Sequence, residues 1–474
     1  MATLWRSGGS GIRRGIRISL LEAIMGGAMY AATEIWLVPL LSQRLGASAH
    51  IFGALTIISQ LGLISLGAVA RQIIVWLGGY SRATIAMCWV QVLTLIALSM
   101  PLYHPQESWA IPVALTLCIL HGLSGAVLAP AWMTWMAELV PRPLMGRYLA
   151  WRWRIFAPTK LVFGFFFAMA IEHWPASHGP FGYQIVLAVA AAGRIASIWL
   201  LAKQHVPKLR PALRGADSQR GPPSTVTLWS FIATMHRTDI GRWTLVWTAL
   251  SFGVLIAGPF FAWYMLAPSP KGLGLDAKTY WWLANTGTVT RFALVAVMGH
   301  LVGLYGAAAV LRVAVIGITV VPGFWAATSN LHYLFVAEIL SGACWCAAET
   351  SVGVLLFCCN RDPIQRVRLI GYNQAVAGVA VVLGTIIGSI ALYQGPDPTA
   401  AGWLPEFEQS TFRTLCLVSM ACRVPALVMA FMLLPTLRTL DARETEGLWR
   451  MIPGAGVTMT VGRGLLGVFR RPEG

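Results

Sequence analysis

Residues 83–101 read ATIAMCWVQVLTLIALSMP and residues 374–394 read QAVAGVAVVLGTIIGSIALYQ, and neither stretch contains a charged side chain. An α-helix rises about 1.5 Å per residue, so about 20 apolar residues cross the roughly 30 Å hydrocarbon core of a bilayer. The sequence therefore predicts an all-α polytopic membrane protein with twelve transmembrane helices. The twelve apolar segments lie near 16–41, 51–77, 83–101, 110–137, 155–171, 182–202, 241–266, 279–302, 309–327, 332–358, 372–394 and 411–435.

The composition of the whole chain supports the same class. Of its 474 residues, 57% are hydrophobic and 11% are charged, whereas soluble domains carry about 25% charged residues. A water-soluble enzyme of this size is excluded, because it could not cover its surface with polar groups. The net charge of +17 would suggest nucleic-acid binding in a soluble protein, but here its distribution along the chain indicates membrane topology, and we expect no nucleic-acid partner.

Lysine and arginine alternate between the loops. If the N-terminus is cytoplasmic, 28 of the 35 basic residues fall in or beside loops on the cytoplasmic side, as the positive-inside rule requires. Twelve spans then place both termini in the cytoplasm. We expect a multi-pass protein of the bacterial inner membrane whose basic face attracts anionic lipid.

The two halves of the chain resemble each other at a shift of about 228 residues. LGASA at 45–49 matches LGLDA at 273–277, Arg194 matches Arg423, and Pro39 and Pro259 close spans one and seven. Two parallel six-helix repeats are a known transporter plan, with the substrate path between the halves. The predicted division is a cytoplasmic N-terminus (1–15), a six-helix bundle (16–202), a cytoplasmic linker (203–240), a second six-helix bundle (241–435) and a cytoplasmic tail (436–474).

Two short segments carry further predictions. Within the linker, residues 228–236 (LWSFIATMH) are expected to form a short helix at the membrane surface. Glycines such as Gly26, Gly27, Gly384 and Gly388 are expected to be close-contact positions between helices, since small residues let helix backbones approach in membranes.

PRPLMGRYLAWRWR at 141–154 follows the fourth span, and short glycine-containing loops follow the second and eighth. With twelve spans and a long basic central loop, these features resemble the major facilitator superfamily over about residues 16–435. The resemblance implies alternating-access transport and a central cavity lined by spans one, four, seven and ten. One feature departs from the family: Val75 and Gly303 occupy the two positions where relatives have Asp after spans two and eight, so the charge relay of that Asp is missing.

Ionisable residues inside the spans are the candidates for function, because an uncompensated charge at the bilayer centre costs at least about 2.5–3.5 kcal/mol. They are Glu22 and Glu34 in span one, His121 in span four, Arg194 in span six, Arg291 in span eight, Glu338 and Glu349 in span ten, and Arg423 in span twelve.

Span ten gives the sharpest prediction. Glu338 and Glu349 are eleven residues, or about three turns, apart, so they share one helix face with Trp345. A carboxyl near the midplane that alternates between protonated and paired forms is what proton coupling needs, and Glu349 is the first candidate. Arg291 either binds an anionic solute or pairs with Glu349, Glu338 or Glu34, and we favour an ion pair between helices.

The other candidates have ordinary alternatives. Glu34 either belongs to a substrate or proton pathway or forms an ion pair between helices. Glu22 either belongs to that pathway or faces lipid headgroups. Tyr30 either lines a pocket or lies in the aromatic belt at the membrane interface. His121 is expected to be a buried histidine whose ring nitrogens have hydrogen-bond partners, and the alternative is a functional histidine. Arg194 and Arg423 are expected to snorkel or to contact carbonyl groups. A cytoplasmic loop network is expected to join Glu138, Arg147 and Arg152.

The leading hypothesis is a secondary transporter that moves a small solute by alternating access, with protons acting on Glu349 or Glu34. The alternatives are a non-transporting assembly or partner-binding membrane protein, and a lipid flippase or membrane enzyme. No Walker motif, Ser-His-Asp pattern or metal-ligand spacing stands out, and the eight cysteines lie in apolar segments. We therefore expect no enzymatic activity, no cofactor and no metal. The expected partners are a small-molecule substrate, protons and membrane lipid, and the assembly alternative adds another membrane protein.

Overall fold

The computed structural model describes residues 10–140, 142–174, 179–205, 228–269, 271–358, 363–392 and 409–434. Within these ranges the chain is helical apart from turns, and it contains no strand. Twelve of the helical segments found there are long and apolar enough to cross a bilayer. The prediction of twelve spans is confirmed, and the chain is an all-α, multi-pass membrane protein.

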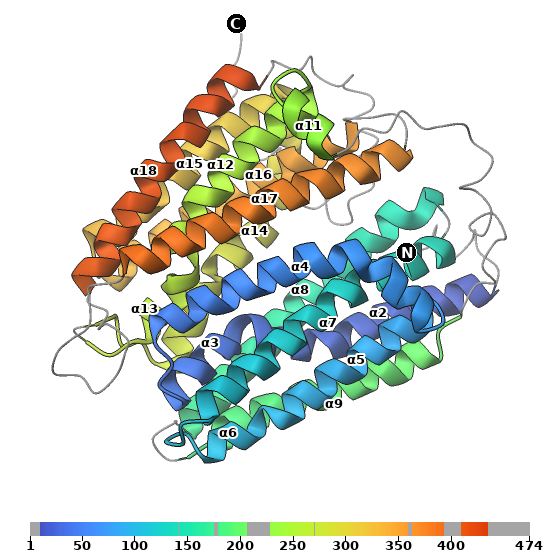
Figure 1. Ribbon diagram of the computed structural model, residues 1–474, viewed down its shortest axis with the longest axis vertical. Coiled ribbons are helices and arrows are strands. Elements are labelled where there is room, and N and C mark those ends of the chain that lie inside the picture. The colour runs from blue at the N-terminus through green and yellow to red at the C-terminus, as the bar shows by residue number, and fades with distance from the viewer. Residues whose placement is uncertain are drawn as a thin grey trace, which may run out of the picture.

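Each half contributes six spans (Figure 1). The first half contains α2 (Ser10–Ala31), α4 (Ala49–Trp76), α5 (Tyr80–Ala97) continued by α6 (Ser99–Tyr103), α7 (Ala110–Leu139), α8 (Arg142–His173) and α9 (Phe181–Ala202). The second half contains α12 (Asp239–Ala257), α14 (Ala277–Tyr305), α15 (Ala307–Ala327), α16 (Leu331–Cys358), α17 (Pro363–Ala391) and α18 (Gln409–Leu433).

Spans one and seven continue past the prolines that were predicted to close them. The first span passes through a wide turn (Ala32–Trp36), the short α3 (Leu37–Pro39) and a second wide turn (Leu40–Arg44). In the seventh, a tight turn (Gly258–Phe260) joins α12 to α13 (Phe261–Leu266). The prediction that Pro39 and Pro259 end these spans is therefore wrong. Proline lacks an N–H and interrupts the helical hydrogen bonds, but the flanking turns let the helix resume.

The predicted repeat has the same backbone geometry in its two copies. Gly46 and Gly274, which are 228 residues apart, have φ of +70° and +60°, and Gly78 and Gly306, also 228 apart, have φ of +82° and +83°. Only glycine adopts this region readily. The turns after spans one and seven and after spans two and eight are therefore built alike.

The helix after the Gly274 turn begins with a side-chain cap. The Asp276 carboxylate accepts a hydrogen bond of 3.2 Å from the backbone N–H of Thr279 at the start of α14. Burial of Asp276 raises the pKa of its carboxyl, but the hydrogen bonds from Thr279 and from neighbouring backbone N–H groups together outweigh burial and hold that pKa below its ordinary value. The charged form of Asp276 is therefore the one that stabilises this helix end.

Within each half the spans pack on one another: α2 contacts α8 and α9 in the first, and α12 contacts α17 and α18 in the second. Small residues permit the closest approaches. A Cβ on Gly384 would meet the carbonyl oxygen of Phe252, and one on Gly388 would meet that of Ile256. The predicted close-contact role of these two glycines is confirmed, and they let α17 lie directly against α12.

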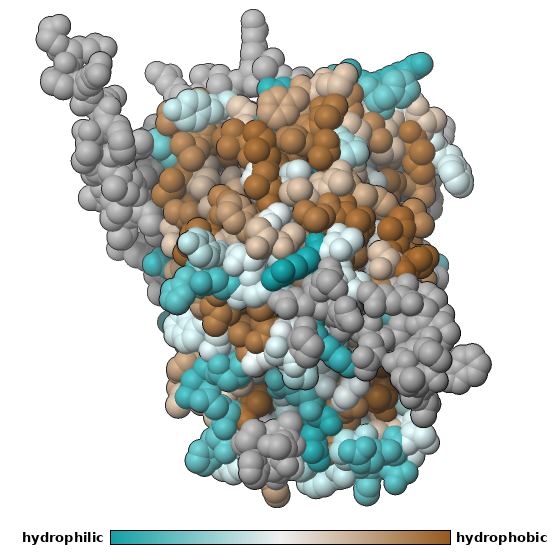
Figure 2. Space-filling view, turned by 90° about the vertical axis from the view of Figure 1, so that its left-hand side faces the viewer, coloured by the Kyte–Doolittle hydropathy of each residue, from teal (hydrophilic) through white to brown (hydrophobic). Residues whose placement is uncertain are grey.

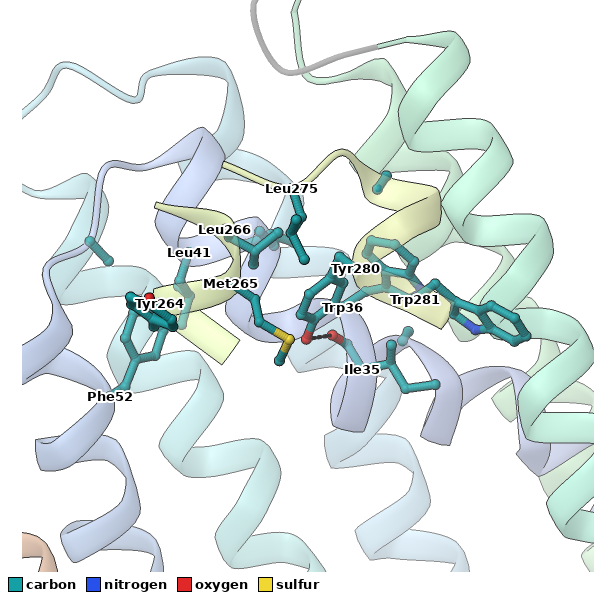
Figure 3. Packing of buried hydrophobic residues seen from close by; sticks show 14 of the residues in the cluster. Ile35, Trp36, Leu41, Phe52, Tyr264, Met265, Leu266, Leu275, Tyr280 and Trp281 are labelled. Atoms are coloured by element: carbon teal, nitrogen blue, oxygen red, sulfur yellow. Dashed lines mark hydrogen bonds between the residues drawn. The ribbon is translucent and has the colours of Figure 1, made fainter. Parts of the chain in front are cut away.

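The two halves meet along α4 with α17 and α8 with α14 (Figure 1). One apolar cluster contains side chains of both halves, whereas the other clusters among the described residues each lie within one half. We call its central part the interbundle seal. It consists of Ile35, Trp36, Leu41, Phe52, Tyr264, Met265, Leu266, Leu275, Tyr280 and Trp281 (Figure 3).

Polar contacts reinforce the interbundle seal. The Tyr280 hydroxyl donates to the Ile35 carbonyl at 3.1 Å (Figure 3), and the Trp263 indole N–H donates to the Ala47 carbonyl at 3.2 Å. These contacts lie at the end of the molecule that carries the loops at 45–48 and 267–276, which we call the seal end. The halves are thus joined by a dry core at the seal end.

The outer surface matches a lipid environment. Over the upper group of helices, Figure 2 shows a broad apolar surface. Val424, Val428 and Phe431 of α18 and Val313 and Val320 of α15 are exposed. In water such a surface would be an aggregation liability, whereas in a bilayer it is ordinary.

The short helix predicted at 228–236 is present as α11 (Leu228–Thr234). Its Phe231 is buried and packs on Tyr372 of α17 with ring centroids 5.7 Å apart, while Trp229 is exposed. The helix is thus fixed on the second half at the end opposite the interbundle seal.

Candidate functional site

An ion pair joins spans eight and ten in the second half. Arg291 of α14 donates to the Glu349 carboxylate of α16 at 2.9 Å, and their side chains are 39% and 53% exposed. The Arg291 guanidinium also lies 5.7 Å from the ring of Trp345. The predicted inter-helix ion pair is therefore present, with Glu349 as the partner among the three acids considered.

The face of α16 that carries this pair points into the second half. Trp345 meets the ring of Trp247 on α12 edge-on at 6.0 Å, while the opposite face exposes Val336 and Leu340. A half-exposed ion pair facing lipid would be costly. Glu349 is instead half-exposed on the face that α16 turns toward α12 and α14.

Glu338 lies on the same face, near the point where α14 and α16 cross. A Cβ on Gly342 would lie 2.5 Å from the carbonyl oxygen of Gly287, and one on Gly287 would lie 3.3 Å from the Glu338 carboxylate. Two glycines thus make room for this acid against the neighbouring backbone. The carboxylate that pairs with Arg291 is that of Glu349, so a role of Glu338 in a pathway stays a prediction.

A matching acid–base pair lies in the first half. Lys160 of α8 donates to Glu34 at 2.5 Å, and the two side chains are 18% and 48% exposed. The 28 basic residues assigned above to loops on the cytoplasmic side include Lys160. That assignment is wrong, because α8 begins at Arg142 and Lys160 lies within the fifth span.

Glu22 forms the centre of a buried charge cluster that joins α2, α8 and α9. Its carboxylate accepts a hydrogen bond of 2.6 Å from Arg152 and lies 3.9 Å from Arg194. The oxygen that faces Arg194 also accepts the Ser197 hydroxyl at 2.9 Å. The side chain of Glu22 is 5% exposed, so the alternative that it faces lipid headgroups is wrong.

The two arginines of this cluster are also held by neutral groups. Arg194 donates to Gln91 on α5, and Arg152 donates to the Ser19 hydroxyl at 3.0 Å and lies 4.3 Å from the ring of Trp132. The expectation that Arg194 snorkels is wrong, because it lies eight residues, about 12 Å, inside the end of α9. The predicted loop network of Arg152 with Glu138 and Arg147 lies outside the described residues, because the side chains of Glu138 and Arg147 are not described.

The repeat-related arginine behaves differently. Arg423 of α18 is buried, donates to the carbonyl oxygen of Ile318 on α15, and bonds the Ser419 hydroxyl at 3.1 Å. The predicted carbonyl contact is confirmed for this residue. The two repeat-equivalent arginines therefore contact different partners: Arg423 binds a backbone carbonyl in the second half, and Arg194 contacts Glu22 in the first.

A cavity of about 280 Å³ opens inside the first half, beside the buried charge cluster. It lies between α2, α5, α7, α8 and α9. Its walls include Glu22, Tyr30, Glu34, Trp132, Arg152, Trp153, Phe156 and Arg194. The structure thus places Tyr30 and Glu34 on the wall of one cavity, together with groups that sequence reasoning assigned elsewhere.

His121 lies away from the walls of this cavity. Its Nδ1 lies 3.0 Å from the Thr94 hydroxyl of α5, a contact between two spans of the same half. This is the satisfied core histidine that was expected as its ordinary role. In the described residues no group of three or more His, Cys, Asp and Glu side chains is placed to hold a metal ion.

Comparisons with known proteins bear on the fold. A single-site mutant of the nucleoside transporter NupG superposes with a TM-score of 0.65 at 11% identity, over 89% of this chain and all of that one. A bacterial homologue of the iron transporter ferroportin in the inward-facing state gives 0.65 at 15% identity, over 91% of this chain and all of that one. The same homologue in the outward-facing state superposes with a TM-score of 0.54 at 16% identity, over 88% of this chain and 98% of that one.

The xylose transporter XylE from E. coli, in an inward open conformation, gives 0.59 at 12% identity, covering 92% of this chain and all of that one. The chain has the major facilitator fold. Protein-family models give no match to the sequence, and curated protein sequences give none either. At these identities the likeness establishes the fold alone.

In a major facilitator fold, the resemblance noted above assigns spans one, four, seven and ten to the central cavity. The pairs Glu34–Lys160 and Glu349–Arg291 each join one of those spans to a flanking one. Sequence reasoning missed Lys160 and Arg152, and it gave Arg194 an ordinary role. A signal was present for Arg194, since a mid-span arginine must have a partner, but which partner cannot be read from spacing.

Proposed function

We propose that the protein is a secondary active transporter that moves a small solute across the bacterial inner membrane by alternating access. In this proposal both termini are cytoplasmic and transport is coupled to protons. The observation that carries this proposal is that the interbundle seal joins the two halves at one end of the molecule, the seal end. The acid–base pairs of both halves are partly exposed.

The depth of the polar groups supports this reading. Glu34 directly precedes Ile35 of the interbundle seal, and Lys160 is one turn from Gly164, where a Cβ would lie 2.7 Å from Trp281. Arg291 lies ten residues, about 15 Å, along α14 from Trp281. In this proposal a water-filled path reaches the interbundle seal from the opposite end and stops there.

The likeness to both states of the ferroportin homologue supports an inward-facing conformation. The TM-score is 0.65 for its inward-facing state and 0.54 for its outward-facing state. In the topology proposed here, the interbundle seal faces the periplasm and the wet path faces the cytoplasm. The protein would then alternate by opening the seal and closing the cytoplasmic path.

A reversible cross-link tests alternating access. Gly53 of α4 faces Ser389 of α17 across the boundary, so closely that a Cβ on Gly53 would meet the Ser389 hydroxyl. In a background without the native cysteines, the double variant Gly53→Cys/Ser389→Cys is oxidised to lock the seal. Oxidation should stop solute flux and a reductant should restore it, while either single variant stays insensitive. Unchanged flux in the fully cross-linked protein would rule out opening at the seal.

Proton coupling is tested with proteoliposomes that contain a pH-sensitive dye. A panel of neutral, cationic and anionic solutes is added outside, and solute-driven proton movement is recorded. Glu349→Gln should abolish that movement, because Gln cannot exchange a proton. Glu107→Gln, in the exposed loop before α7, is the matched control. Scrambling of labelled lipid without solute flux would instead support a flippase.

A further inference from the structure

The cavity in the first half has a charge balance that selects its occupant. Glu22 is saturated, since its two carboxylate oxygens already interact with Arg152, Arg194 and the Ser197 hydroxyl. Glu34 is neutralised by Lys160. Two guanidinium groups share one carboxylate, so the buried cluster carries one net positive charge.

One donor of this cluster has no acceptor among the described residues. Arg194 is 2% exposed and lines the cavity, and its Nε–H is enclosed without a hydrogen-bond partner among the described residues, so it adds positive charge behind the cavity wall. A buried guanidinium N–H without an acceptor costs free energy. Guanidinium groups bind carboxylate groups well because their planar donors match the carboxylate oxygens. The polar part of the cavity therefore favours a single negative charge.

The remaining walls are aromatic. Phe156 meets Tyr30 edge-on at 5.1 Å and Trp153 at 5.6 Å, and Trp132 belongs to the α7 wall. Trp153 is 65% exposed and Met133 is 57% exposed, so they lie at the mouth. Aromatic walls prefer flat apolar ligands, which stack on them or meet them edge-on. At about 280 Å³ the cavity is at the small end of ligand pockets, which suits one or two fused rings.

We propose that this cavity binds a small aromatic carboxylate, with its negative charge beside Arg194 and Arg152 and its ring between Trp132 and Trp153. That this ligand is also the carried solute rests on the proposed function, but binding itself does not. Placement within the first half, beside a fixed charge cluster, distinguishes the site from the Glu349–Arg291 pair of the second half. The charge of the ligand is specified by the cluster, and its shape by the aromatic walls.

Binding is tested by isothermal titration of the full-length protein in detergent with three probes that share one ring system: indole-3-acetate, tryptamine and indole-3-ethanol. Indole-3-acetate should bind about tenfold or more tightly than the other two, since only it carries a carboxylate. Equal affinities, or tighter binding of the cationic tryptamine, would overturn the assigned charge. No heat from any probe would overturn the site.

Two variants locate the binding. Trp153→Ala, at the exposed mouth, should weaken indole-3-acetate binding about tenfold, and Trp153→Phe should retain most of it. Trp229→Ala, at an exposed position of α11, is the matched control and should bind as the parent does. Arg194→Gln should remove the preference for the carboxylate, and thermal unfolding shows whether it is folded. Full binding by Trp153→Ala would refute the location.

Flux measurements separate this proposal from the transporter proposal. If indole-3-acetate binds but no solute crosses proteoliposome membranes, the transport function fails and the site stands. If other solutes cross while indole-3-acetate neither binds nor competes, the site fails and transport stands.

Discussion

Replacing Glu22 by Gln should destabilise the protein strongly. The substitution keeps the shape of the side chain but removes the negative charge that contacts Arg152 and Arg194, at 2.6 and 3.9 Å. The side chains of Glu22 and Arg194 are 5% and 3% exposed, so water cannot take over the role of the carboxylate. Removing one partner of a buried ion pair costs about 3–5 kcal/mol, and we expect a loss of that size.

The same substitution at Glu34 is the matched control, because it lies in the same span. The Glu34 side chain is 48% exposed and pairs with Lys160 of α8. Exposed ion pairs contribute about 0–1 kcal/mol. Glu34→Gln should therefore change stability little, whatever it does to transport.

The free energy of unfolding is measured by titrating the purified protein in micelles with sodium dodecyl sulfate and following helix content by circular dichroism. The double variant Glu22→Gln/Arg194→Gln should regain part of the lost stability, since it removes one of the two stranded charges. Equal stability of Glu22→Gln and Glu34→Gln would refute the reasoning. So would a double variant whose loss equals the sum of the single losses.

Three further predictions concern packing, gating and pH. Gly388→Val should prevent folding, seen as loss of the monodisperse peak on size exclusion, whereas Gly371→Ala, where a Cβ meets nothing within 4 Å, should elute normally. Tyr280→Phe removes the hydrogen bond between Tyr280 and Ile35 in the interbundle seal, which contributes about 0.5–1.5 kcal/mol. A cysteine probe at Leu275→Cys should then react about two- to tenfold faster with an impermeant maleimide. An unchanged reaction rate would contradict a gating role for this hydrogen bond. The charged form of Asp276 stabilises α14 and its pKa is lowered, so the stabilisation is present above the unfolded-state pKa and is lost as pH falls through the folded-state pKa. The difference in melting temperature between the parent and Asp276→Asn should narrow on acidification, and a constant gap would contradict the capping role.

The number and positions of the spans could be predicted because they depend on local hydropathy. Each span must satisfy its backbone hydrogen bonds within itself, so apolar length alone decides whether a segment crosses the membrane. The repeated turns were also accessible, since Gly46 and Gly274 are needed wherever φ is positive. Where a proline lies within a span, as Pro39 does, the sequence pattern is ambiguous. A proline is found both where a helix is interrupted and resumes and where it ends.

The partners of the charged residues could not be predicted in the same way. Helical spacing correctly placed Glu338, Trp345 and Glu349 on one face, because three turns of one helix fix their relative direction. It could not say that Arg152 and Arg194 share Glu22, because those contacts join residues more than 100 positions apart. Such contacts depend on which helices are neighbours and how they are rotated.

By itself the sequence determined a membrane protein of twelve helices arranged as a repeated six, since hydropathy and turn glycines act over a few residues at a time. Only the tertiary structure decided which charges are paired in buried positions and which are exposed, and at which end the halves join. The physical reason is that the free energy of a charge in a membrane is set by the groups that surround it in space. Glu22 and Glu34 lie in one span, yet packing makes the first the centre of a buried cluster and leaves the second half-exposed.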